Sequence, residues 1–93
     1  MKIEENVVYW CKTKKLAKEF LQECKKQKIT WCDGSKITDT KWEVFKEDTC
    51  YIYNCNIHLA FLEKFSYTNL IYTSLHFNHC KVLKVVEFKG VEQ

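Results

Sequence analysis

The chain contains no proline and no arginine, and its only glycines are Gly34 and Gly90. All fifteen basic residues are therefore lysines. Lysine presents a point charge, whereas bidentate readout of guanine and planar clamping of phosphate are mainly the work of arginine. Sequence-specific DNA recognition is thus disfavoured, although lysine can still attract nucleic acid. Two isolated glycines also exclude a glycine-rich phosphate loop.

Long apolar runs are scarce as well. No stretch approaches the roughly 20 apolar residues that a membrane-spanning helix needs. Residues 1–6 include two acids and are not followed by a long apolar stretch, which does not fit a signal peptide. We therefore expect no membrane partner, and a protein that stays in the compartment where it is made.

What the chain does have is enough apolar material for one core. It has 93 residues, of which 46% are hydrophobic and 15% aromatic. This length suits a single domain over residues 1–93. The pattern predicts an α+β fold, with one principal helix packed on a mainly antiparallel sheet of four to six strands.

The expected elements follow from periodicity. A strand over 6–11 leads to a helix over 13–27, with Thr13 as its N-cap. After a β-rich piece at 29–32 and an irregular stretch at 35–48, a second strand covers 49–55. We expect another short strand starting at Ile57 and running into a helical turn, then strands over 70–77 and 81–88.

The predicted helix is amphipathic and basic. From Lys12 to Lys28 there are seven lysines and two glutamates, a net charge of +5 in a chain whose total is +3. Such an uneven field attracts polyanions or acidic protein surfaces. We take Lys14, Lys18 and Lys25 as candidate partner-binding residues, although a solvated helix face commonly has this composition.

Aromatic residues are the second candidate binding group. Strand alternation places Tyr51 and Tyr53 on the face opposite Cys50 and Ile52. Exposed tyrosines are frequent anchors of protein interfaces, so Tyr51, Tyr53 and Tyr72 are partner-binding candidates, with burial in the core as the alternative. We expect Trp31 and Trp42 to belong to the core.

The chain has six cysteines, but we find no export signal in the sequence. We therefore expect reduced, mostly buried thiols rather than disulfides. The cluster at 76–80 (His-Phe-Asn-His-Cys) contains potential zinc ligands, and Cys50, Cys55 and His58 lie upstream. Because no Cys-x-x-Cys spacing occurs, we predict no metal and no cofactor. We assign no catalytic residue, and Cys11 and Cys32 are the cysteines best placed for reactivity.

Several pieces taken together resemble a known kind of protein. They are residues 7–18, the Ile-Thr-Trp-Cys-Asp-Gly run at 29–34, Trp42, the Thr-Cys-Tyr run at 49–51 and the closing Val-Leu-Lys-Val-Val-Glu-Phe at 82–88. This order resembles small accessory proteins of phages and prophages in AT-rich bacteria. The chain departs from that pattern between His58 and Phe77, where it is longer and more apolar.

The resemblance implies a stoichiometric inhibitor of bacterial defence, a class that includes anti-CRISPR proteins, in the cytoplasm of a bacterial host. Its partner would be a host defence protein, such as a CRISPR effector nuclease or its guide-RNA complex. The net charge argues against an acidic DNA mimic. A small lysine-rich nucleic-acid-binding accessory protein is the alternative, and a cysteine- or zinc-dependent enzyme is a third.

Overall fold

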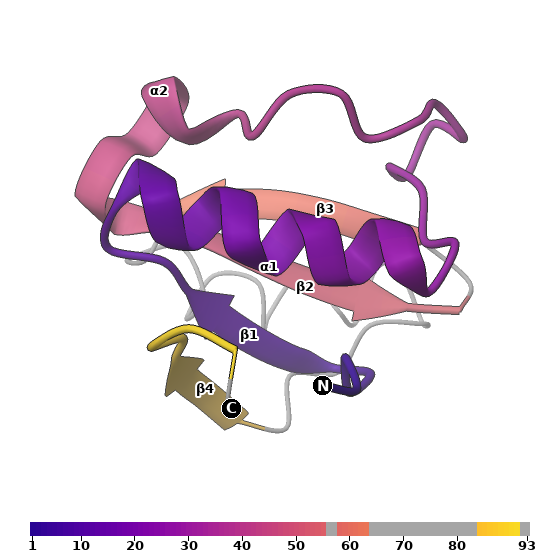
Figure 1. Cartoon of the computed structure of the whole chain (residues 1–93), viewed down its shortest axis with the longest axis horizontal. Coiled ribbons are helices and arrows are strands. Elements are labelled where there is room, and N and C mark those ends of the chain that lie inside the picture. The colour runs from indigo at the N-terminus through magenta and orange to yellow at the C-terminus, as the bar shows by residue number, and fades with distance from the viewer. Residues whose placement is uncertain (56–57, 64–83, 92–93) are drawn as a thin grey trace, which may run out of the picture.

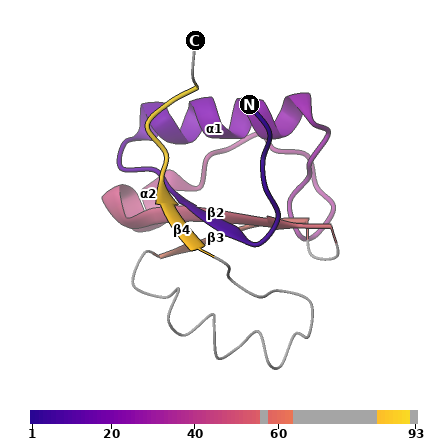
Figure 2. The ribbon, with the colours of Figure 1, turned by 90° about the horizontal axis from the view of Figure 1, so that it is seen from below.

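Helix α1 (Lys14–Lys26) lies across one face of a mixed β-sheet (Figure 1). The computed structural model describes residues 1–55, 58–63 and 84–91. Within them the remaining elements are β1 (Val7–Trp10), α2 (Trp42–Phe45), the 3₁₀ helix η1 (Lys46–Asp48), β2 (Thr49–Asn54), β3 (His58–Glu63) and β4 (Lys84–Glu87). Figure 2 shows α1 as a layer over the sheet, which is seen there close to edge-on.

The described strands are ordered β3-β2-β1-β4. Strand β2 pairs antiparallel with both β1 and β3, whereas β1 pairs in parallel with β4. The predicted α+β class is confirmed. The expectation of a mainly antiparallel sheet is met only in part, because the parallel β1–β4 pairing makes the sheet mixed.

Helix α1 begins where the sequence predicts. The Oγ1 atom of Thr13 accepts a hydrogen bond of 3.1 Å from the backbone N–H of Leu16, so Thr13 is the N-cap. At the other end, Lys28 has a φ of 60° and turns the chain out of the helix. The apolar stripe of α1 packs on the sheet, with Ala17, Phe20 and Cys24 fully buried.

Phe20 is the centre of the core between helix and sheet. Its ring centroid lies 4.9 Å from that of Tyr9 and 5.4 Å from those of Tyr51 and Phe88. Aromatic pairs at such separations add to the free energy gained by burial. One aromatic side chain from α1 thus joins β1, β2 and the residue after β4.

The two faces of β2 are used as alternation predicts. Tyr51 points toward α1, while Cys50 and Ile52 lie in a second buried cluster with Val8 of β1. Ala60 of β3 packs against that second cluster. Both faces of β2 are therefore covered, although Tyr53 is only partly buried.

Several expectations need correction or lie beyond the described residues. The stretch 35–48, expected to be irregular, contains α2 and η1. The β-rich piece at 29–32 contributes an isolated bridge from Trp31 to Leu59 rather than a strand. Trp31 is buried as predicted, whereas Trp42 is only partly buried against the core. The predicted strand at 70–77 lies outside the described residues.

Candidate functional site

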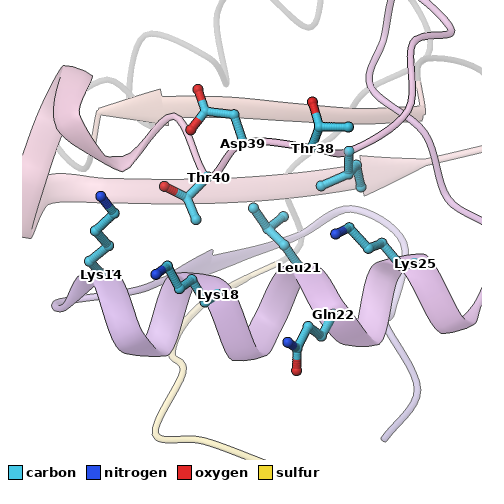
Figure 3. Close-up of a pocket in the computed structure, with 9 residues that line it drawn as sticks. Lys14, Lys18, Leu21, Gln22, Lys25, Thr38, Asp39 and Thr40 are labelled. Carbon is cyan, nitrogen blue, oxygen red and sulfur yellow. The ribbon is translucent and has the colours of Figure 1, made fainter.

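Lys14, Lys18 and Lys25 lie along one side of α1, facing the segment 37–40 (Figure 3). Positions 14, 18, 21 and 25 follow the i, i+4, i+7, i+11 spacing that places residues on one stripe of a helix. This stripe and the facing segment enclose a groove of about 320 Å³. We call it the lysine groove; its lining consists of Lys14, Lys18, Leu21, Gln22, Lys25, Ile37, Thr38, Asp39 and Thr40.

The wall opposite α1 is anchored to the sheet from below. Ile37 and Thr40 are buried, and the hydroxyl of Tyr51 donates a hydrogen bond to the backbone carbonyl of Thr40. The Oγ1 atom of Thr40 accepts a hydrogen bond of 3.1 Å from the backbone N–H of Trp42. Thr49 Oγ1 in turn donates to the Trp42 carbonyl over 3.2 Å. Two side chains of β2 thus hold this region in place: Tyr51 bonds the segment 37–40, and Thr49 bonds the start of α2.

The three lysines differ in what they contact. The Nζ atom of Lys14 lies 2.7 Å from Oε1 of Glu43, and this hydrogen-bonded ion pair links α1 to α2 and raises the pKa of Lys14. Lys18 and Lys25 are exposed, and neither forms an ion pair within the described part of the chain. A partner could pair with either of these two lysines without breaking an ion pair within the described part of the chain.

The acidic residue of the groove is Asp39. Its Oδ2 atom lies 3.9 Å from the Nζ atom of Lys41, a residue that does not line the groove. At this separation and exposure the pairing is a weak surface contact. The lysine groove therefore has three positive charges and one negative charge in its lining.

A second groove, of about 430 Å³, adjoins the first. The two share Lys25, Ile37 and Thr38, and the second adds Lys28 and Lys36 to the lysines of the first. Five lysines thus border two neighbouring hollows on the side of the molecule formed by α1 and the segment after Trp31. The sequence predicted the basic helix but not the segment 37–40 that faces it. The available signal for that segment was Ile37, an isolated apolar residue among polar neighbours, which indicates a buried anchor.

The tyrosine candidates are not gathered with the lysines. Tyr51 is 0% exposed and belongs to the core, which is the alternative that the sequence left open for it. Burial raises its pKa. Tyr53 is partly buried and lines a different groove with Glu4 and Glu5. Tyr72 lies outside the described residues.

The described cysteines differ in their exposure to solvent, and therefore in their suitability as nucleophiles. Cys11 and Cys24 are buried, and burial raises the pKa of both thiols, that of Cys24 to about 12. Cys11, one of the two thiols best placed by sequence, therefore remains protonated at neutral pH and is shielded from solvent. Cys32, the other, is exposed beside the Asp33–Ser35 turn.

Cys55 is exposed and contacts an acid. Its backbone N–H donates to Oε1 of Glu5 over 2.6 Å, and the Glu5 carboxylate raises the pKa of the thiol. Among the described residues, no three His, Cys, Asp or Glu side chains are grouped as metal ligands would be. His76, His79 and Cys80 of the 76–80 cluster lie outside these residues. No described helix is both long and apolar enough to cross a bilayer.

No family model, curated protein or solved structure matches this chain.

Proposed function

We propose that this protein is a non-enzymatic, stoichiometric inhibitor of a bacterial defence system, of the anti-CRISPR kind, that docks on an RNA-guided nuclease through the lysine groove. One observation carries the proposal. Lys18 and Lys25 are exposed on a rigid helix beside a hollow, and neither is paired within the described part of the chain. The target class comes from the resemblance to phage accessory proteins.

Physical reasons favour binding through this surface. The seven lysines between Lys12 and Lys28 give that region a net charge of +5, which steers acidic surfaces toward it. Because α1 is capped by Thr13 and packed on the core by Phe20, the lysines are presented by a preorganised element. Preorganisation reduces the entropy lost on binding.

A second candidate, a nucleic-acid-binding accessory protein, is favoured by a different observation. Five lysines border the two adjoining grooves, enough to contact several phosphates of one strand. Affinity for RNA alone, falling by orders of magnitude between about 50 and about 200 mM salt, would support this candidate over the inhibitor.

The test is a titration of an RNA-guided nuclease, already loaded with its guide RNA, before target DNA is added. We expect target cleavage to fall linearly with added protein and to stop at a fixed small ratio of protein to nuclease. A stable complex should also appear by size-exclusion chromatography at low salt.

Two other outcomes would contradict the proposal. Inhibition that is complete at a small fraction of the nuclease concentration, and that increases with time, would indicate turnover and therefore an enzyme. In that case a single Cys→Ala change or a chelator should abolish it. Absence of both inhibition and complex formation across nucleases of several types would remove the inhibitor assignment altogether.

A further inference from the structure

Strand β3 stands at one end of the strand order, so only one of its two edges is paired with another strand of the described sheet (Figure 1). On the outer edge, the N–H of Leu59 donates to the Thr30 carbonyl and the Leu59 carbonyl accepts from the N–H of Cys32, over 2.9 Å each. Because backbone groups alternate between the two edges of a strand, the N–H and C=O of Phe61 and the N–H of Glu63 also face outward. These three groups form no hydrogen bond within the described part of the chain.

The pairing along this outer edge stops because the neighbouring chain turns away. The N–H of Gly34 donates to the Trp31 carbonyl over 2.8 Å, and Gly34 has a φ of 86°, which a residue with a side chain rarely adopts. The Asp33 carboxylate accepts a hydrogen bond of 2.9 Å from the N–H of Ser35 and fixes the turn. The piece that pairs with β3 therefore ends before this turn, and the outward groups of Phe61 are left beyond it.

A hollow of about 270 Å³, which we call the β3 hollow, lies beside these outward groups. Ala60 and Phe61 both line it, although consecutive residues of a strand point to opposite faces, so the hollow lies at the edge of the sheet and not on one face. The Phe61 ring packs against those of Trp31 and Phe45, with centroids 5.9 and 5.8 Å away, which preorganises the edge. The far wall of the hollow includes Trp31, Cys32, Asp33, Ser35 and Lys41.

We propose that an extended segment of a partner protein adds to the sheet along this edge as a further strand. Its backbone donates to the Phe61 carbonyl and accepts from the N–H groups of Phe61 and Glu63, an arrangement that an extended chain matches. One apolar side chain of the segment enters the β3 hollow and contacts Trp31 and Phe61. The inference stands apart from the proposed function, because no residue of the β3 hollow lines the lysine groove.

A second copy of this chain fits the edge less well than a short segment does. Two copies could pair only beyond Leu59, whose outward groups are already bonded to Thr30 and Cys32. The described edge then offers residues 61–63 of each copy, whereas a stable dimer buries about 800 Å² on each partner. A short segment can bind weakly through so few residues, because the rest of its protein can make further contacts elsewhere.

Amide hydrogen exchange followed by NMR tests whether the edge is open. In the free protein, the amide of Phe61 should exchange roughly tenfold faster than that of Leu62, whose N–H faces β2 in its pairing with Cys50. Comparable protection of the two amides would show that the edge is closed and would overturn the inference.

The binding probe is a capped peptide of alternating valine and threonine, titrated while the amide signals of Phe61 and Glu63 are followed. Two modified forms carry N-methyl groups, one on the valines and the other on the threonines. Because successive residues of a strand present their N–H groups to opposite edges, only one form loses the donors that face β3. That form should bind roughly tenfold more weakly than the unmodified peptide, and the other within about twofold. Equal affinities of the two modified forms, or no binding of the unmodified peptide, would overturn the inference.

Protein variants locate the binding. Cys32→Trp fills the β3 hollow and should abolish peptide binding, and Ser35→Trp replaces it should circular dichroism show that the first variant folds poorly. Cys55→Trp is the matched control, because Cys55 is exposed like Cys32 but does not line the hollow, and it should bind within about twofold of the parent. Retained binding in the Cys32→Trp variant would contradict the inference. A dimer that forms with rising concentration in sedimentation, and that Cys32→Trp abolishes, would assign the edge to a second copy and would contradict it as well.

Discussion

The hydroxyl of Tyr51, a residue of the central strand β2, donates a hydrogen bond to the backbone carbonyl of Thr40 in the wall of the lysine groove. The ring of Tyr51 stacks on that of Phe20 from α1, the opposite wall. One buried side chain therefore touches both sides of the groove. Tyr51 thus supports the lysine groove from within the core.

This relationship predicts two distinct effects of substitution at Tyr51. Tyr51→Phe preserves the ring but leaves the buried Thr40 carbonyl without its donor, and should lower the free energy of unfolding by about 1–3 kcal/mol. Tyr51→Ala also creates a cavity and should cost about 3–5 kcal/mol. Urea unfolding followed by tryptophan fluorescence measures both. An alanine variant as stable as the parent would show that Tyr51 is not in the core.

The hydroxyl oxygen of Thr13 caps the first turn of α1. Thr13→Ala removes the hydrogen bond to the Leu16 N–H and should destabilise the protein by about 1 kcal/mol, because the first turn of α1 loses its cap. Thr13→Ser is the matched control, since it retains the hydroxyl and should remain close to the parent. Thermal unfolding followed by circular dichroism would detect the difference. Equal stability of the alanine and serine variants would contradict the cap.

Thiol alkylation reports on the burial of the cysteines. In the folded protein we expect iodoacetamide to label Cys32 and Cys55 and to spare Cys11 and Cys24, which are buried with raised pKa values. Removing the carboxylate by Glu5→Gln should accelerate labelling of Cys55, because Glu5 raises the pKa of that thiol and reduces its thiolate fraction. Peptide mapping by mass spectrometry identifies each site. Rapid labelling of Cys11 would contradict the packing of β1 against α1.

Acid should destabilise the fold through its bonded carboxylates. Lys26 lies 2.9 Å from Glu23 and lowers the pKa of that carboxyl below its ordinary value of 4.5, and the Ser35 hydroxyl lowers the pKa of Asp33. A lowered folded-state pKa contributes stability above the unfolded-state value, and this contribution is lost as the pH falls through the folded-state value. Stability should therefore drop from about pH 5 downward.

Glu23→Gln provides the control for the acid effect. This variant lacks the titrating group, so its free energy of unfolding should change less between about pH 7 and about pH 3 than that of the parent. Urea midpoints at the two pH values measure the difference. An identical acid dependence in parent and variant would show that Glu23 is not part of it.

The local rules predicted much of the fold. Helical spacing of apolar residues and the Thr13 cap located α1, and alternation located β1, β2 and the start of β3, because these signals come from neighbours in sequence. The parallel partnership of β1 and β4 depends on a pairing between distant residues, which periodicity does not encode. The sequence did not predict α2, because a four-residue helix is too short to show a periodic pattern.

Only part of the candidate site could be predicted from the sequence. Charge counting identified the lysines of α1, because charged side chains stay at the surface of a packed helix. It did not distinguish Lys14, which pairs with Glu43, from Lys18 and Lys25. For Tyr51, alternation assigned the correct face of β2 but could not say that α1 covers that face. Which side of a strand becomes buried is decided by the tertiary arrangement.

The most direct test of the central claim is a nuclease-inhibition titration with two matched double variants. Lys18→Glu with Lys25→Glu should raise the protein concentration needed for half inhibition by roughly a hundredfold, because both groove charges would repel an acidic partner. Lys15→Glu with Lys89→Glu carries the same net charge and should inhibit as the parent does. If the two variants inhibit equally, whether both like the parent or both weakened, the lysine groove is not the binding surface.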